Sequence, residues 1–221
     1  MDPVICTVDV ALLTLAADGL EVALLKREHA PFKGVTALPG GYIHTQADAD
    51  ARDAARRVLL DKTGIAAPYL EQLATFSGAA RDPRGWSVSI AYYALVPAAT
   101  IAQAERSQVR LYSVDRLPPL PFDHSTIIDT AVSRLRSKSQ YSSLPCHLLG
   151  EAFTLPQLQR VYEILLGETI NKVSFRRKMS EMNMLDAVDG QFDASGAHRP
   201  AQLYRLKSAF REQLQLLERG L

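Results

Sequence analysis

The sequence contains little cysteine, no excess of either charge and no long apolar run. Its two cysteines, Cys6 and Cys146, lie far apart without a CxxC pair, so neither a disulfide framework nor a structural zinc site is indicated. No stretch approaches the roughly 18 consecutive apolar residues that span a membrane, and the start, Met1-Asp2-Pro3, lacks the basic and apolar regions of a secretory signal. We therefore expect a cytoplasmic protein with no membrane attachment.

The charge balance is nearly even, with 25 Lys and Arg against 24 Asp and Glu and a formal net charge of +1. Such a balance excludes a nucleic-acid binder that works through a uniformly basic surface, but it allows a local basic face. The 221 residues are 47% hydrophobic and 22% charged, which is an ordinary globular composition. This length accommodates one domain or two unequal domains, and the order of the segments favours two.

The first part of the chain predicts an α/β module. Apolar segments predict strands at residues 4–15, 20–25, 70–76, 87–96 and 110–113, and the spacing of apolar residues predicts helices at 48–63 and 126–135. A polar, serine-rich segment at residues 137–145 predicts a connection exposed to solvent. We place the domain boundary in this connection, which gives domains 1–140 and 141–221.

The remainder of the chain predicts a winged helix-turn-helix. Residues 155–166 and 173–182 have helical patterns, residues 186–199 form a loop rich in Gly, Asp and Ser, and residues 201–206 predict a strand that returns from this loop. Two successive helices followed by such a loop are typical of that motif. Residues 203–221 repeat apolar side chains at helical intervals, which predicts a final amphipathic helix that either supports dimerisation or belongs to the domain core.

A glycine elbow at residues 38–42 (LPGGY), followed by a helix that ends at residues 57–65, resembles the Nudix box. The resemblance implies a Nudix-like α/β/α sandwich with a mixed sheet. In that family, three glutamates at i, i+3 and i+4 share one helix face, where they hold divalent metals that activate water for pyrophosphate hydrolysis. The acids nearest to the family's earlier glutamate are Asp48 and Asp50, which we interpret as solvated charges at the helix start.

The box is degenerate in this chain. When the pattern is matched at Gly64, its arginine is Arg57, whereas its three glutamate positions hold Val58, Asp61 and Lys62. Val58 cannot bind a hard cation and Lys62 repels one, so we predict no metal site, no role for magnesium and no hydrolase activity, with Arg57 and Asp61 as vestiges. The alternative is an active hydrolase that cleaves ADP-ribose, with Asp61 and other acids holding magnesium.

A second segment, residues 81–86 (RDPRGW), resembles the arginine- and proline-bearing loop of Nudix proteins that handle ADP-ribose. Its two guanidinium groups suit bidentate contact with phosphate at a pocket mouth, although the same residues also make a good surface turn. Glycines in the elbow allow a ligand to approach the backbone, and nearby aromatic side chains either stack on adenine or pack locally. The predicted ligand-binding residues are Arg27, Gly40, Gly41, Tyr42, Arg57, Arg81, Arg84 and Trp86.

Residues 172–178 (KVSFRRK) carry four basic side chains and no acid. On a helix, Phe175, Met179 and Met182 form a buried stripe, which leaves the basic side chains free to reach base edges and phosphates. The alternative is a solvated basic face with no partner. Further cations and polar groups close the predicted wing and lie where a phosphate backbone could run. The predicted DNA-binding residues are Thr154, Lys172, Ser174, Arg176, Arg177, Lys178, Arg199, Gln202 and Tyr204.

Together the two halves resemble the Nudix-related transcriptional regulators (NrtR-like), in which a degenerate Nudix domain precedes a winged helix. The resemblance covers nearly the whole chain. It implies a homodimer that binds a palindromic operator in double-stranded DNA, represses genes of NAD biosynthesis or salvage, and releases the DNA when ADP-ribose or a related NAD metabolite binds. No cofactor is expected. A protein-interaction adaptor with neither activity is a third alternative.

Overall fold

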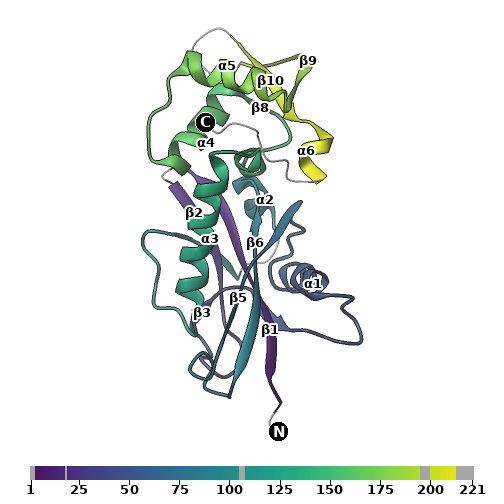
Figure 1. Ribbon diagram of the computed structural model, residues 1–221, viewed down its shortest axis with the longest axis vertical. Helices are drawn as coiled ribbons and strands as arrows, with labels where there is room; N and C mark the ends of the chain where they lie inside the picture. The colour runs from purple at the N-terminus through teal and green to yellow at the C-terminus, as the bar shows by residue number, and fades with distance from the viewer. Residues whose placement is uncertain (1–2, 18, 105–107, 195–199, 213–221) are drawn as a thin grey trace. The chain divides into compact units, whose positions relative to one another are not determined.

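The computed structural model describes residues 3–17, 19–104, 108–194 and 200–212 (Figure 1). The chain forms two compact units, Met1–Arg134 and Leu135–Leu221. The division falls inside one helix, whereas the boundary at residue 140 stays a prediction. Within these described ranges, no helix is long and apolar enough to cross a membrane.

The first unit is built on a mixed sheet of seven strands. The strands are β1 (Ile5–Ala16), β2 (Gly19–Lys26), β3 (Thr36–Ala37), β4 (Gly40–Tyr42), β5 (Tyr69–Gly78), β6 (Ser87–Leu95) and β7 (Val109–Ser113). The order is β3-β2-β1-β6-β5, with β4 paired to β1 and β7 paired to β2. Strands β1 and β6 run parallel, and the other pairs are antiparallel. Because β1 lies at the centre, its middle residues are buried on both faces, which explains its continuous apolar sequence.

The helices of this unit are α1 (Ala51–Thr63), α2 (Ala98–Gln103) and the first part of α3 (His124–Ser139). In Figure 1, α1 and α3 lie on either side of the strands. Helix α1 begins where the Asp50 side chain accepts a hydrogen bond from the Asp53 N–H and ends at Gly64, whose φ of 74° is left-handed. Its apolar face, which includes Val58 and Leu59, packs into the sheet core. The mixed sheet flanked by helices confirms the predicted fold class of this half.

The second unit has the predicted winged-helix elements. They are the 3-10 helix η1 (Leu144–Leu148), β8 (Phe153–Thr154), α4 (Leu155–Leu166), α5 (Lys172–Met182), β9 (Leu185–Asp193), β10 (Ala201–Leu206) and α6 (Ser208–Glu212). The strands form an antiparallel sheet in the order β8-β10-β9. The core contains Tyr162 from α4 and Phe175 from α5, and the centres of their rings lie 5.6 Å apart. This contact holds α5 by its apolar face.

The prediction that residues 137–145 form a solvent-exposed connection is wrong. Helix α3 continues to Ser139, and η1 begins at Leu144. Ser139 and Ser142 are buried, and their hydroxyls donate hydrogen bonds of 2.7 Å to backbone carbonyl oxygens four residues earlier. Because serine can satisfy its hydroxyl within its own turn, a serine-rich segment need not face water.

Two expectations at the C-terminal end also change. The loop expected at residues 186–199 is, as far as Asp193, strand β9 of a hairpin with β10. The helix expected at residues 203–221 begins later, because residues up to Leu206 belong to β10, where Leu206 is buried. Helix α6 follows at Ser208–Glu212. The rest of the predicted amphipathic helix lies outside the described residues.

Candidate functional site

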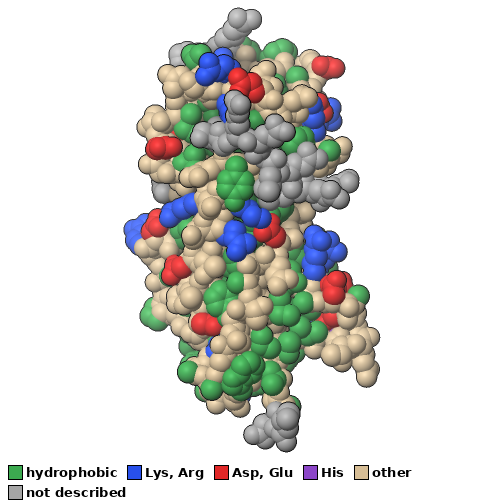
Figure 2. Space-filling model, in the orientation of Figure 1, with side chains coloured by type: hydrophobic (Ala, Val, Ile, Leu, Met, Phe, Trp, Pro, Cys, Tyr) green, Lys and Arg blue, Asp and Glu red, His purple; other side chains and the backbone are tan. Residues whose placement is uncertain are grey.

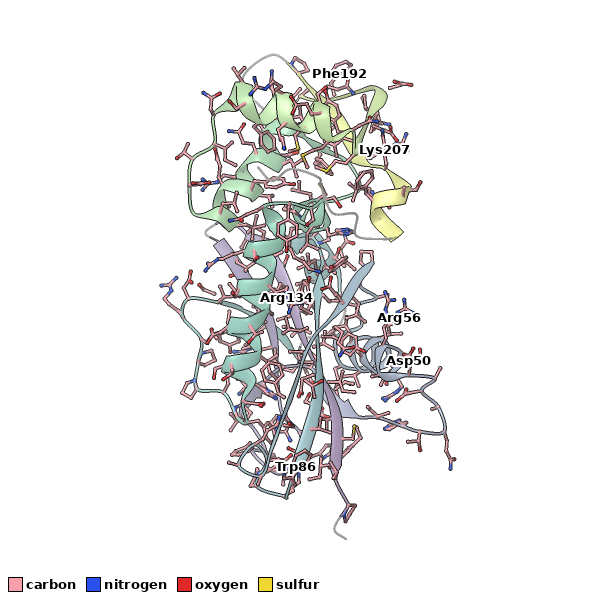
Figure 3. The ribbon with its side chains drawn as sticks, in the orientation of Figure 1. Asp50, Arg56, Trp86, Arg134, Phe192 and Lys207 are labelled. Carbon is pink, nitrogen blue, oxygen red and sulfur yellow. The ribbon has the colours of Figure 1, made fainter. Side chains whose placement is uncertain are left out.

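The first unit contains a cavity of about 970 Å³. Its wall is formed by β1, the segment after β2, the glycine elbow, one face of α1, the loop before β6 and the start of α3. The charged or polar lining residues include Asp9, Arg27, Tyr42, Arg57, Asp61, Lys62, Arg81, Asp82, Arg84 and His124. Of the predicted ligand-binding set, only Trp86 is not in this lining. Trp86 is 49% exposed and lies just before β6 (Figure 3).

The glycine elbow is required by the packing of the protein itself. A Cβ atom at Gly40 would overlap the Asp9 carboxylate, and one at Gly41 would lie 3.1 Å from Cγ2 of Val58. These glycines therefore allow β4 to approach β1 and α1 closely. The sequence pattern by itself predicts only that they let a ligand approach the backbone. Both glycines do line the cavity, so they shape it and form part of its wall.

A buried charge cluster lies in the wall of the cavity. Arg81 donates from Nη2 to Oδ2 of Asp9 and from Nε to Oδ2 of Asp123, both at 2.9 Å. The Arg81 side chain is only 6% exposed. The sequence interpretation placed Arg81 at the pocket mouth, and this is wrong, because two carboxylates draw its guanidinium into the protein. Arg81 fixes the wall and leaves little of its charge for a ligand.

Asp9 and His124 were missed as site residues by the sequence analysis. Nδ1 of His124 accepts a hydrogen bond of 3.0 Å from the N–H of Leu38, and its Nε2 lies 3.6 Å from Oδ1 of Asp9. Burial lowers the pKa of His124, so the ring is neutral and Nε2 carries its proton. The signal for Asp9 was present, because an acid between Val8 and Val10 interrupts an apolar strand. His124 gave no such signal, because its partners are distant in sequence.

Two further arginines, Arg27 and Arg84, line the cavity. Arg84 pairs with Asp82, with 2.6 Å between Nη2 and Oδ2, and its guanidinium lies 5.5 Å from the centre of the Tyr42 ring. Arg27 lies over the Phe122 ring at 4.8 Å. Burial and then the positive charge of Arg84 lower the pKa of Arg27. Asp82 already accepts from Nε and Nη2 of Arg84, so the charge of Arg27 is the one more available to an anion.

Arg57 is held by a carboxylate at the start of α1. It donates from Nε and Nη2 to Asp48 at 2.6 and 2.7 Å, and also to the Tyr42 carbonyl oxygen at 3.0 Å. The hydrogen bond from Arg57 is the main cause that lowers the pKa of Asp48 to about 2. The Asp48 side chain is only 1% exposed, so its interpretation as a solvated charge is wrong. Asp50 does have the predicted place at the helix start.

The residues on the cavity face of α1 do not fit the metal ions that a Nudix box holds. Val58 is apolar and 2% exposed, and Asp61 lies 4.0 Å from Arg57. Lys62, the remaining residue of the pattern, adds a positive charge to the lining. In the described part of the chain, no cluster of three or more His, Cys, Asp or Glu side chains could hold a metal. Hard divalent ions need several oxygen ligands. This face presents a single carboxylate, that of Asp61.

In the second unit, helix α5 presents its basic side to solvent. The Asn171 side chain caps the helix by accepting hydrogen bonds from the N–H groups of Val173 and Ser174 at 3.0 and 3.1 Å. Phe175 and Met179 are 1% and 3% exposed, as the predicted stripe requires. Of the predicted DNA contacts on α5, Lys172, Ser174, Arg176 and Arg177 are exposed and Lys178 is half-buried.

The other predicted DNA contacts have structural roles or lie outside the described residues. Thr154 is buried and caps α4, because its hydroxyl accepts a 3.3 Å hydrogen bond from the Gln157 N–H. The side-chain amide of Gln202 donates to backbone carbonyl groups within the β9–β10 hairpin, including that of Val188 at 2.8 Å. Tyr204 packs against the core of the unit. Arg199 lies outside the described residues. Thr154 and Gln202 therefore have structural roles in this unit, and their contacts with DNA stay predictions.

Charge on the surface agrees with the even composition. Figure 2 shows Lys and Arg side chains interspersed with Asp and Glu on the face in view. Strand β9 of the hairpin carries Asp186, Asp189 and Asp193 and no basic residue. Strand β9 therefore adds no positive charge to this unit, whereas α5 carries four basic residues.

Comparison with known proteins matches each half of the chain to a domain family. Residues 7–131 match the NUDIX domain family, and residues 145–206 match the NrtR DNA-binding winged helix domain family. A curated relative from Acinetobacter baylyi, described as an ADPR responsive transcriptional repressor NtrR, is 42% identical over 204 residues, which cover 90% of this chain and 80% of the relative.

Solved structures support the same assignment. The crystal structure of Shewanella oneidensis NrtR complexed with a 27mer DNA has a TM-score of 0.88 and 38% identity, covering 98% of this chain and 99% of that one. The NUDIX domain of Shewanella oneidensis NrtR complexed with ADP ribose has a TM-score of 0.56 and 37% identity, covering 61% of this chain and 90% of that one.

Proposed function

The chain belongs to the NrtR family of NUDIX-domain regulators, and on that premise we propose that it represses transcription by binding double-stranded DNA and releases the DNA when ADP-ribose binds. A related NAD metabolite is the alternative effector. The controlled genes would be those of NAD biosynthesis or salvage. The observation that carries the proposal is the presence, in one chain, of a cavity lined by arginines and a helix with a solvent-facing basic side.

The cavity suits a nucleotide diphosphate. Arg27 would contact the diphosphate, because a guanidinium offers charged donors to phosphate oxygens, and Arg84, whose fork is held by Asp82, would add positive charge in the same lining. Tyr42 is 50% exposed and lines the cavity, so its ring is available to stack on a base or ribose. Gly40, Gly41 and Arg57 complete the proposed wall. Of the predicted set, Arg81 would act as a positioning residue, and Trp86 is not retained.

We propose that this protein is a sensor and not a hydrolase, and that it binds its effector without metal. Divalent ions would normally neutralise a diphosphate and activate water. Here Lys62 would supply positive charge directly, from the α1 face where Val58 and Asp61 offer a single carboxylate. Without a metal-bound water or another activated nucleophile, the diphosphate would be bound and left intact.

Helix α3 gives the proposed response a physical route. Its first residue, His124, lines the cavity, and the helix continues without interruption to Ser139 in the second unit. A ligand that displaces the wall near His124 would act on the first residue of a helix whose last residues belong to the second unit. ADP-ribose could change DNA affinity by no more than the ratio of its own affinities for the DNA-binding and the DNA-releasing arrangement of the protein.

DNA recognition would use α5 from each protomer of a homodimer. The amino-terminal residues of a recognition helix contact base edges in the major groove, and a dimer places two such helices on half-sites about one helical turn apart. A palindromic operator follows from that symmetry. The retained contacts are Lys172, Ser174, Arg176, Arg177 and, at the flank, Lys178. Such a repressor acts where the chromosome lies, which in a bacterium is the cytoplasm.

Two assays on the same purified protein test this proposal. Duplexes selected from a random-sequence DNA library should bind with nanomolar affinity and be released by ADP-ribose. Incubation of the protein with ADP-ribose and magnesium should liberate no AMP. Rapid magnesium-dependent AMP release without sequence-selective DNA binding would contradict the proposal and favour a hydrolase. Failure of both assays would favour an adaptor.

A further inference from the structure

Val173 is exposed at the start of the basic helix α5. Its relative exposure is 76%, higher than that of any other large exposed hydrophobic residue in the described part of the chain. A single exposed valine needs no explanation by itself. Its position is what distinguishes it, because it lies in the first turn of the helix that the proposed function places in the major groove.

The direction of Val173 is set by the helix and its cap. The Asn171 cap accepts a hydrogen bond from the Val173 N–H, which fixes where α5 begins. Val173 and Arg177 are one turn apart, so they share a face. Phe175 and Met179 are buried on another side of the helix. Val173 and Arg177 therefore point outward together.

The described strands of the β9–β10 hairpin carry a net negative charge, so α5 is expected to be the main reader of sequence. Strand β9 carries three aspartates and no cation. In β10, the side-chain amide of Gln202 donates hydrogen bonds to carbonyl groups of the hairpin itself. Among the exposed residues of the first turns of α5, Lys172, Ser174, Arg176 and Arg177 are polar or charged. Val173 is the apolar residue among these exposed positions of α5.

In the major groove of unmodified DNA, donors and acceptors distinguish the base pairs, and the C5-methyl group of thymine is the apolar feature. We infer that Val173 determines sequence specificity by contacting the C5-methyl group of one thymine in each half-site, while Arg177 contacts a neighbouring phosphate or guanine. This inference rests on the proposed DNA-binding function. It adds a residue and a base that the basic pattern alone did not indicate.

The test removes the methyl group from the DNA and the valine from the protein. Duplexes selected by the full-length protein are resynthesised with each thymine replaced in turn by deoxyuridine, which lacks only that methyl group. Fluorescence anisotropy then gives the Kd of the wild type and of Val173→Ala for each duplex. We expect one position per half-site at which deoxyuridine weakens wild-type binding about fourfold, the value of one buried methyl group. Val173→Ala should bind the thymine duplex more weakly and be insensitive at that position.

Val4→Ala is the matched control, because Val4 is also exposed, at 55%, but lies in the first unit. It should retain the deoxyuridine sensitivity of the wild type. Equal melting temperatures of the variants would exclude a folding effect. The inference is overturned if no deoxyuridine substitution weakens wild-type binding, or if Val173→Ala keeps the same sensitivity. Failure of the wild type to select any sequence would instead remove the proposed function and, with it, this inference.

Discussion

Arg81 and Asp9 form a buried ion pair in the wall of the cavity, with 2.9 Å between Nη2 and Oδ2 and side chains that are 6% and 8% exposed. A second carboxylate, Asp123, accepts from Nε of the same arginine at 2.9 Å. These contacts join strand β1, the loop before β6 and the residue that precedes α3. Arg81 therefore holds together three segments that are distant in sequence.

Removing this arginine should destabilise the first unit. Arg81→Gln would leave two carboxylates close together with no countercharge, and breaking a buried pair in this way costs about 3–5 kcal/mol. Trp86 is the single tryptophan of the chain and belongs to the first unit, so its fluorescence during urea unfolding reports on that unit. Asp61→Asn is the control, because Asp61 is 62% exposed and its pair with Arg57 spans 4.0 Å. Its effect should stay within about 0.5 kcal/mol. An unchanged urea midpoint for Arg81→Gln would contradict the structural role.

Arg27 should contribute to effector affinity. Its pKa is lowered by burial and by Arg84, so a bound diphosphate gains from contact with this charge. We expect Arg27→Gln to weaken ADP-ribose binding at least tenfold, or about 1.4 kcal/mol, in isothermal titration calorimetry. Lys33→Gln removes a nearby exposed cation that is not part of the lining and should bind normally. Equal affinity of the two variants would remove Arg27 from the binding site.

ADP-ribose binding should not depend on divalent metal. The α1 face offers Val58, Asp61 and Lys62 in place of a set of carboxylates, so affinity should be the same in EDTA and in magnesium. Lys62→Glu replaces the ammonium with an acid beside Asp61. This variant should bind ADP-ribose more weakly in EDTA and recover part of its affinity when magnesium is added. Loss of wild-type binding in EDTA would show that a metal site exists after all.

The sequence predicted the elements of the fold better than the wall of the cavity. Apolar periodicity is a local property, so α1, α4 and α5 were found within a few residues of their ends. The partnership of Asp9 with Arg81 and His124 depends on segments far apart in the chain, which no local pattern encodes. Composition misled where serine hydroxyls bond within their own turn, at Ser139 and Ser142, and where a glycine-rich segment proved to be strand β9.

Stability should fall on mild acidification because His147 is buried. Burial lowers the pKa of His147 to about 4, below its ordinary value of 6.5. The unfolded chain therefore binds a proton first as the pH falls below 6.5, which favours unfolding until about pH 4. Between pH 6.5 and pH 5 the free energy of unfolding should fall by roughly 2 kcal/mol for this reason. In calorimetry, the melting temperature of His147→Gln should fall less than that of the wild type between pH 6.5 and pH 5. Equal losses would contradict a neutral buried histidine.

Reciprocal binding tests the central claim most directly. DNA affinity is measured by anisotropy with and without saturating ADP-ribose, and ADP-ribose affinity is measured by calorimetry with and without saturating DNA, both in EDTA. The account predicts that ADP-ribose weakens DNA binding and that DNA weakens ADP-ribose binding by the same factor, because coupling between two sites is mutual. Identical affinities in the presence and absence of the other ligand would show that the cavity does not control the winged helix.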